Sequence, residues 1–218
     1  MSQQRGLFLD FDGTLANSLT AMNTVYMNFL SFYGVVGSKQ EFEELNEPTW
    51  REIVSILRKK YSLTPSEKLL SEQYFSQIHK TYLTIEPNPG AKELLEFANQ
   101  KNWPCSIVSS NSEKIINSWL ERVGLRNYIK NIVAMEHITH SKPSPEPYLK
   151  ALTLANCKPT ASFAVEDSLA GVRAARAASI PTFYLLNNST EELEKKSPIL
   201  NLEKISNLTE MIEKLKNK

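Results

Sequence analysis

Two aspartates, Asp10 and Asp12, stand two residues apart at the end of an apolar run in the segment GLFLDFDGTL, residues 6 to 15. The apolar run predicts a buried strand, and a carboxylate carried into the core loses the hydration that its ionised form needs. Two carboxylates placed side by side also repel each other. The pair therefore requires compensating groups from other parts of the chain.

Polar residues also follow the other apolar segments that read as strands. Strands alternate with helices from residue 86 onward, which predicts an α/β fold with a doubly wound parallel sheet covered on both faces. Besides the first strand, we expect strands at 104–110, 131–135, 162–167 and 181–186. In such sheets the ligand site lies beyond the carboxyl ends of the strands.

The residues at these strand ends form one candidate site. It comprises Asp10 and Asp12, Ser109, Ser110 and Asn111, Lys142, and Glu166 and Asp167. Four carboxylates beside a single lysine are tolerable only with a bound cation, and ligands that are all oxygen favour Mg²⁺ over zinc or copper. Singly, each residue has an ordinary explanation, such as a turn aspartate or a helix cap. Those explanations do not account for all of them ending strands at the same edge.

Residues 16–85 differ from the rest because they contain no convincing strand. Apolar residues recur there at helical spacing in three stretches, 18–34, 49–61 and 65–83. We therefore expect residues 1–15 and 86–218 to form the α/β core, and residues 16–85 to form a small all-α domain inserted after the first strand.

Four segments, in chain order, resemble the motifs of the haloacid dehalogenase-like (HAD) hydrolase superfamily. They are DFDGTL (10–15), SIVSS (106–110), SKPSPEPY (141–148) and VEDSLAG (165–171). The resemblance covers essentially the whole chain and fits the phosphatase and phosphoglucomutase branch, with a helical cap after the first motif. It implies a Rossmann-like core. Many relatives carry aspartate at the position of Asn17, which affects expectations for the cap hinge rather than for the core chemistry.

The resemblance also implies roles for the acids. Asp10 corresponds to the nucleophile that forms an aspartyl phosphate, and Asp12 to the general acid and base. Asp167 would hold Mg²⁺ with the Asp10 side chain and the Asp12 carbonyl. Glu166 would be either a further ligand or a partner for water on the metal. Lys142 would neutralise charge on the nucleophile and on the phosphoryl group.

Further residues would contact the phosphate or the substrate. Gly13 lets the chain turn sharply after the first strand, and Thr14 lies beside the site. Ser109, with the amide of Ser110 and the neighbouring Asn111, would bind the phosphoryl group. In the cap, Arg51 is a candidate contact for a second anionic group of the substrate, although a solvated arginine is the commoner situation.

These expectations favour a Mg²⁺-dependent phosphatase that acts on a small phosphorylated metabolite. A phosphomutase for a sugar phosphate, with the same aspartyl phosphate, is the main alternative. A phospho-receiver signalling protein is a further one, but receivers usually carry adjacent acids and lack a helical insertion. The substrate itself (phosphoglycolate, a sugar phosphate or a nucleotide) is not readable from the sequence.

The composition of the 218 residues gives no sign of a nucleic-acid or membrane partner. The 25 basic and 24 acidic residues nearly cancel, so no strong field attracts either polyanion. No apolar run approaches the roughly 20 residues needed to span a bilayer. We expect a cytoplasmic protein without a leader segment, monomeric, whose partner is a small phosphorylated substrate.

Overall fold

The computed structural model describes residues 4–45, 48–186 and 202–216. Within these ranges one sheet of six parallel strands has the order β3-β2-β1-β4-β5-β6. The strands are β1 Leu7–Leu9, β2 Cys105–Val108, β3 Ile129–Val133, β4 Phe163–Glu166, β5 Thr182–Leu185 and β6 Glu203–Ile205. The central strand β1 pairs with β2 on one side and with β4 on the other. This order, in which the chain winds outward from β1 in both directions, confirms the predicted doubly wound α/β core.

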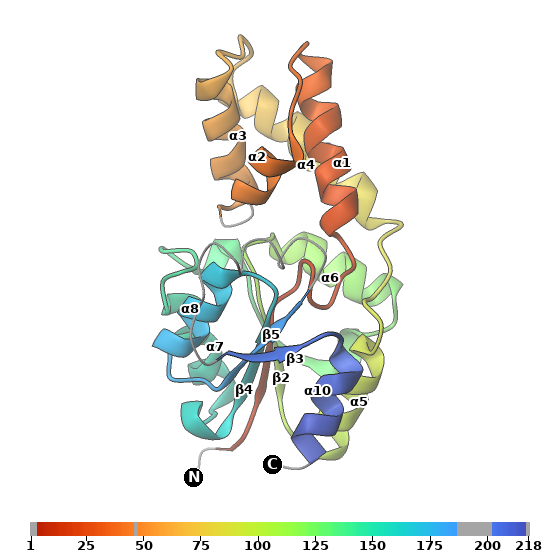
Figure 1. Cartoon of the computed structure of the whole chain (residues 1–218), viewed down its shortest axis with the longest axis vertical. Helices are drawn as coiled ribbons and strands as arrows, with labels where there is room; N and C mark the ends of the chain where they lie inside the picture. Colours follow the sequence, from red (N-terminus) through yellow and green to blue (C-terminus); the bar gives the residue numbers. More distant parts are fainter. Residues whose placement is uncertain (1–3, 46–47, 187–201, 217–218) are drawn as a thin grey trace.

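Helices cover both faces of the sheet (Figure 1). The core helices are α5 Ala91–Gln100, α6 Glu113–Arg122, α7 Glu146–Ala155, α8 Leu169–Ala177 and α10 Leu208–Lys216. Short 3₁₀ turns lie at η1 Arg126–Tyr128, η2 Met135–His137 and η3 Pro159–Ala161. Side chains alternate across β1, so Leu7 and Leu9 pack in the cluster with α5, α6 and α10, while Phe8 packs with α7 and α8.

Four further helices stand together above the edge of the sheet where the strands end (Figure 1). They are α1 Leu19–Phe32, α2 Lys39–Glu44, α3 Trp50–Lys60 and α4 Glu67–Tyr82, and we call this group the cap. Its own core combines aliphatic and aromatic side chains, with Phe29 of α1 edge-on to Tyr74 of α4 at a centroid separation of 4.9 Å. The helical character predicted for this part of the chain is therefore present.

The two segments that connect the cap to the core run side by side. Ala16 forms an antiparallel bridge with Pro87, and the amide of Asn17 donates to the carbonyl of Glu86 at 3.0 Å. The amide of Asn88 in turn donates to the carbonyl of Leu15 at 2.8 Å. Movement of the cap relative to the core would thus act on a paired, hydrogen-bonded hinge.

Two elements were not expected from the sequence. Helix α2, KQEFEE, is six residues long and mostly polar, so it carries almost no apolar periodicity. Strand β6, EKI, is a three-residue edge strand with an exposed centre. In the part of the chain described here, no helix is both long and apolar enough to cross a membrane.

Candidate active site

The sheet register places Asp10 between two neighbouring strand ends. Leu9 is aligned with Ile107 of β2 and with Val165 of β4, so the next residue, Asp10, stands beside Val108 and Glu166. The Asp10 amide continues the ladder by donating to the carbonyl of Val165 at 3.0 Å. The side chain of Asp10 is consequently fixed at the centre of the carboxyl edge of the sheet.

Lys142, on the loop that follows β3, contacts two of the acids. Its Nζ lies 2.6 Å from Asp10 Oδ1 and 2.5 Å from Glu166 Oε1, and it donates to the carbonyl of Val108 at 2.9 Å. Burial by itself lowers the pKa of the ammonium group, but the carboxylates of Asp10 and Glu166 outweigh it and raise the pKa. Lys142 is therefore held in its charged form.

Three carboxylates crowd around this lysine. Oxygen atoms of Asp10, Glu166 and Asp167 all lie within 4.8 Å of one another, and all three side chains are buried. Burial, aided by the neighbouring acids and opposed by Lys142, raises the pKa of Asp10 to about 7. Burial and the charges of Asp10 and Glu166 raise the pKa of Asp167 well above its usual range. Among the described residues, one ammonium group faces three carboxylates, which once ionised carry the charge that a divalent cation requires.

The donors and the surrounding backbone fit such a cation. Oε2 of Glu166 is buried and makes no hydrogen bond with the described residues. Glycines allow the chain to approach the acids closely: a Cβ at Gly171 would lie 1.9 Å from Glu166 Oε2, and one at Gly13 would lie 2.0 Å from Asp167 Oδ2. Oxygen donors of this hardness suit Mg²⁺.

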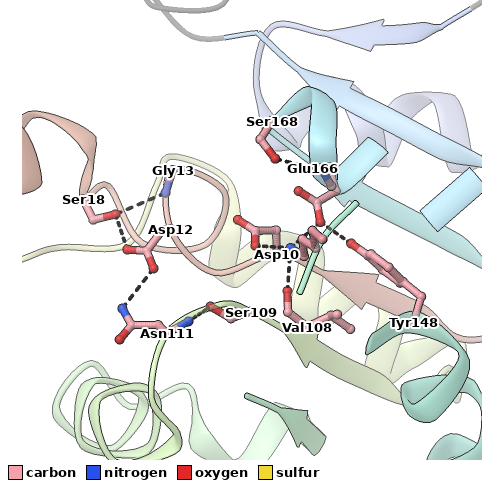
Figure 2. A network of polar contacts seen from close by, with 12 residues as sticks. Asp10, Asp12, Gly13, Ser18, Val108, Ser109, Asn111, Tyr148, Glu166 and Ser168 are labelled. Atoms are coloured by element: carbon pink, nitrogen blue, oxygen red, sulfur yellow. Dashed lines mark hydrogen bonds and ion pairs between the residues drawn. The ribbon is translucent and has the colours of Figure 1, made fainter. Parts of the chain in front are cut away.

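Asp12 points toward Ser18 and Asn111 (Figure 2), and three hydrogen bonds hold its carboxylate. Ser18, just before α1, donates to its Oδ1 at 2.7 Å, and the Asn111 side-chain amide donates to its Oδ2 at 3.0 Å. The hydroxyl of Tyr82, at the end of α4, also donates to Oδ1. Gly13 turns the chain with φ +74°, and its amide donates to Ser18 Oγ at 3.2 Å.

Of the remaining site residues predicted in the core, some line the cavity and others are buried beside it. Ser109 and Ser110 line the cavity, and Ser109 Oγ accepts the amide of Asn111 at 3.0 Å. Thr14 is fully buried and, unlike the two serines, does not line the cavity; its hydroxyl has no partner among the described residues. The structure thus brings the residues of all four motifs to one place.

Arg51 does not reach the active site. It is exposed at the start of α3, and its guanidinium lies over the ring of Trp50, 5.1 Å from the centroid. Trp50 lines the cavity, whereas Arg51 does not. An arginine one position further along a helix points about 100° away, which explains why the expected contact is not formed here.

The site opens into a cavity between the core and the cap, with about 860 Å³ of empty space that includes a part open to solvent. The core side is formed by Asp10, Asp12, Ser109, Ser110, Asn111, Lys142, Asp167, Ser168 and Ala170. The cap side is formed by Leu19, Met22, Phe42, Leu45, Pro48, Trp50, Ile53, Tyr74 and Ile78, which we call the cap wall.

Sequence reasoning missed three residues that contact the acids: Ser18, Tyr82 and Tyr148. Tyr148, on α7, donates its hydroxyl to Glu166 Oε1. Its position six residues after Lys142 in SKPSPEPY was visible, but a tyrosine on an amphipathic helix is usually part of the core. Ser18 and Tyr82 begin and end the cap helices, and nothing in their local sequence distinguishes them from helix-capping or core residues.

Comparison with known proteins agrees with this geometry. A family model described as "Haloacid dehalogenase-like hydrolase" matches residues 7–185. The chain belongs to this family. It is 27% identical over 176 residues to the fructose-1-phosphate phosphatase YqaB of Escherichia coli, covering 80% of this chain and 93% of that protein. It is 25% identical over 179 residues to the phosphorylated carbohydrates phosphatase of Thermotoga maritima, covering 82% and 83%.

The fold of this HAD-like chain is also that of solved structures. The β-phosphoglucomutase of Clostridium difficile superposes with a TM-score of 0.81 at 21% identity, over 99% of this chain and 96% of that one. The match spans both the sheet and the cap helices. At this level of identity the likeness establishes the fold and not the reaction.

Proposed function

We propose that this HAD-like protein is a Mg²⁺-dependent phosphatase that hydrolyses a small phosphate monoester through an aspartyl phosphate on Asp10. One observation carries the proposal: Asp10 and Asp12 lie on one short loop at the floor of the cavity, each held by a different set of partners. Lys142 holds Asp10, whereas uncharged donors hold Asp12. Two acids in such different surroundings suit two different tasks.

In the first step a carboxylate oxygen of Asp10 attacks phosphorus, and the bond from phosphorus to the ester oxygen breaks. Asp12 gives its proton to that leaving oxygen, so the alcohol departs neutral. In the second step Asp12 takes a proton from a water molecule, whose oxygen attacks the aspartyl phosphate. Phosphate is released, and both acids return to their starting forms.

The remaining residues of the site supply charge and position. Lys142 and the polar groups of Ser109 and Ser110 would stabilise the negative charge that develops on the phosphoryl oxygens. Such electrostatic stabilisation is the largest contribution to the rate of phosphoryl transfer. A bound Mg²⁺, held by Asp10 and Asp167 with Glu166 as a further or indirect ligand, would supply positive charge beside the same oxygens. Its charge would also favour the ionised form of Asp10 that attacks.

The phosphatase is favoured over a phosphomutase by the cap wall. A mutase of this kind must hold a bisphosphate intermediate, whose second phosphate lies away from Asp10 and needs a cationic partner. The residues described for the cap wall include no lysine or arginine. The names of the relatives YqaB and the T. maritima phosphatase support the same choice.

The proposal is tested by phosphate release from p-nitrophenyl phosphate with and without Mg²⁺. We expect the wild-type protein to release phosphate only with Mg²⁺, and the Asp10→Asn variant to lose essentially all of this activity. An Asp10→Asn protein that keeps full activity would exclude Asp10 as the nucleophile. Faster interconversion of hexose phosphates than release of phosphate would favour the mutase.

A further inference from the structure

The cavity has two chemically different halves. On the core side, eight of the nine lining residues are polar or charged, with Ala170 as the exception. On the cap side, seven of the nine residues have purely hydrocarbon or thioether side chains: Leu19, Met22, Phe42, Leu45, Pro48, Ile53 and Ile78. The phosphate belongs with the polar half, so the rest of the substrate must lie against the cap wall.

The two remaining cap-wall residues offer only single polar atoms. Tyr74 is almost fully buried, and burial raises the pKa of its phenol, which therefore stays neutral. The indole N–H of Trp50 is buried and makes no hydrogen bond with the described residues. Among the described residues, the cap side can thus serve at most two hydrogen-bonding groups of a substrate, but not a series of hydroxyls.

None of the charged side chains described in the cap lines the cavity. Glu41 of α2 is buried inside the cap, where Lys60 lies 2.7 Å away and Tyr61 donates to it at 2.6 Å. Tyr26 donates to the same carboxylate. Arg51 stacks on Trp50 from the solvent side. Within the described residues, the cap therefore presents no charged side chain to the cavity.

We propose that the substrate is a phosphate monoester whose alcohol part is mainly apolar, with at most two hydrogen-bonding groups facing the cap. This inference rests on the proposed phosphatase function and names its substrate class. It differs from what the names of the sugar-phosphate relatives would indicate for this chain. An apolar leaving group gains from burial against the cap wall, because hydrocarbon surface leaves water.

A sugar phosphate would lose affinity in the same place. Each hydroxyl that enters the cavity gives up hydrogen bonds to water, and an apolar wall returns none. The loss grows with the number of buried hydroxyls. The preference for an apolar ester over a sugar phosphate therefore has two sources: the unpaired polar groups of the buried sugar, and the fit of the apolar ring against the cap wall.

The test compares cyclohexylmethyl phosphate with glucose 6-phosphate. Both are phosphates of a primary alcohol on a six-membered ring, so the leaving groups are similar and the ring hydroxyls are the main difference. Methyl phosphate, too small to reach the cap wall, serves as the reference. We expect kcat/KM for cyclohexylmethyl phosphate to exceed that for glucose 6-phosphate by roughly 100-fold.

Two isoleucines on α3 provide matched variants. Ile53 lines the cavity, whereas Ile56 is 42% exposed and does not. We expect Ile53→Asn to lower the ratio of kcat/KM for cyclohexylmethyl phosphate to that for methyl phosphate by about tenfold. The melting temperature of the variant shows separately whether it folds. Ile56→Asn should change neither value.

The outcomes separate the two proposals. Equal or better hydrolysis of glucose 6-phosphate, with methyl phosphate still hydrolysed, overturns the substrate class and leaves the phosphatase standing. A preference for the apolar ring that survives unchanged in Ile53→Asn also overturns it, because the cap wall is then not its source. Absence of Mg²⁺-dependent phosphate release from all three esters overturns the phosphatase, and the substrate class falls with it.

Discussion

The hydroxyl of Tyr82, the last residue of the last cap helix, donates to the carboxylate of Asp12 on the loop after β1. The Tyr82 ring also stacks on Phe11, with 5.6 Å between centroids and 16° between planes. Ser18, at the other connection to the cap, donates to the same carboxylate oxygen. The proposed proton donor is thus attached to both ends of the cap.

Tyr82→Phe should lower kcat by about tenfold and leave KM nearly unchanged, because Asp12 loses a donor that orients it while the phosphate contacts remain. Steady-state kinetics on methyl phosphate measure this. Tyr33→Phe is the control, since Tyr33 also bonds across the cap, to Gln73, but does not contact the site. Equal effects of the two changes would show that Tyr82 serves only the packing of the cap.

Lys142→Met should lower kcat by a factor of about 10² to 10³, because the charge beside Asp10 and the phosphoryl group is lost. It should also change stability, since the carboxylates of Asp10 and Glu166 lose their shared ammonium partner. Kinetics and thermal melting with Mg²⁺ follow the two effects. Retention of near wild-type kcat would mean that Lys142 does not neutralise charge during the transfer.

Gly171→Ala should selectively weaken Mg²⁺ binding, because the added Cβ would lie 1.9 Å from Glu166 Oε2 and must displace that carboxylate. We expect the Mg²⁺ concentration for half-maximal activity to rise by about tenfold. Gly124→Ala is the control: it meets no atoms within 4 Å but strains a residue at φ +72°, so it costs stability without touching the acids. An unchanged Mg²⁺ requirement in Gly171→Ala would separate Glu166 from the metal site.

The metal-free protein should lose stability as the pH rises from about 5 to about 8. The folded-state pKa of Asp10 is raised to about 7, and that of Asp167 is raised well above its usual range. Within this window the folded chain therefore holds protons that the unfolded chain has released, and the free energy of unfolding falls with pH. Melting in the presence of EDTA should show a decrease of several degrees.

Mg²⁺ should stabilise the protein more at the upper end of this range, where the acids must otherwise ionise without a counter-charge. The Asp167→Asn variant, which removes one of the raised groups, should show a shallower fall of melting temperature with pH. A melting temperature that is flat or rises over the range in EDTA would contradict the electrostatic account of the cluster.

The sequence was sufficient to predict the α/β core and the groups at its strand ends, because both follow from local patterns. Asp10 and Asp167 directly follow parallel strands, Lys142 lies on the loop after β3, and the sheet brings them together. The contact of Tyr82 with Asp12 spans 70 residues and depends on how the cap sits on the core. Arg51 illustrates the same limit, since one helical position decides whether a side chain reaches the cavity.

The central claim is that Asp10 carries the phosphoryl group during turnover. The most direct measurement is mass spectrometry of peptides from wild-type protein quenched in acid while it hydrolyses a phosphate monoester with Mg²⁺. The account predicts one phosphoryl group on Asp10, absent without Mg²⁺ and absent in Asp10→Asn. A phosphoryl group on a different residue, with Asp10 unmodified throughout turnover, would contradict it.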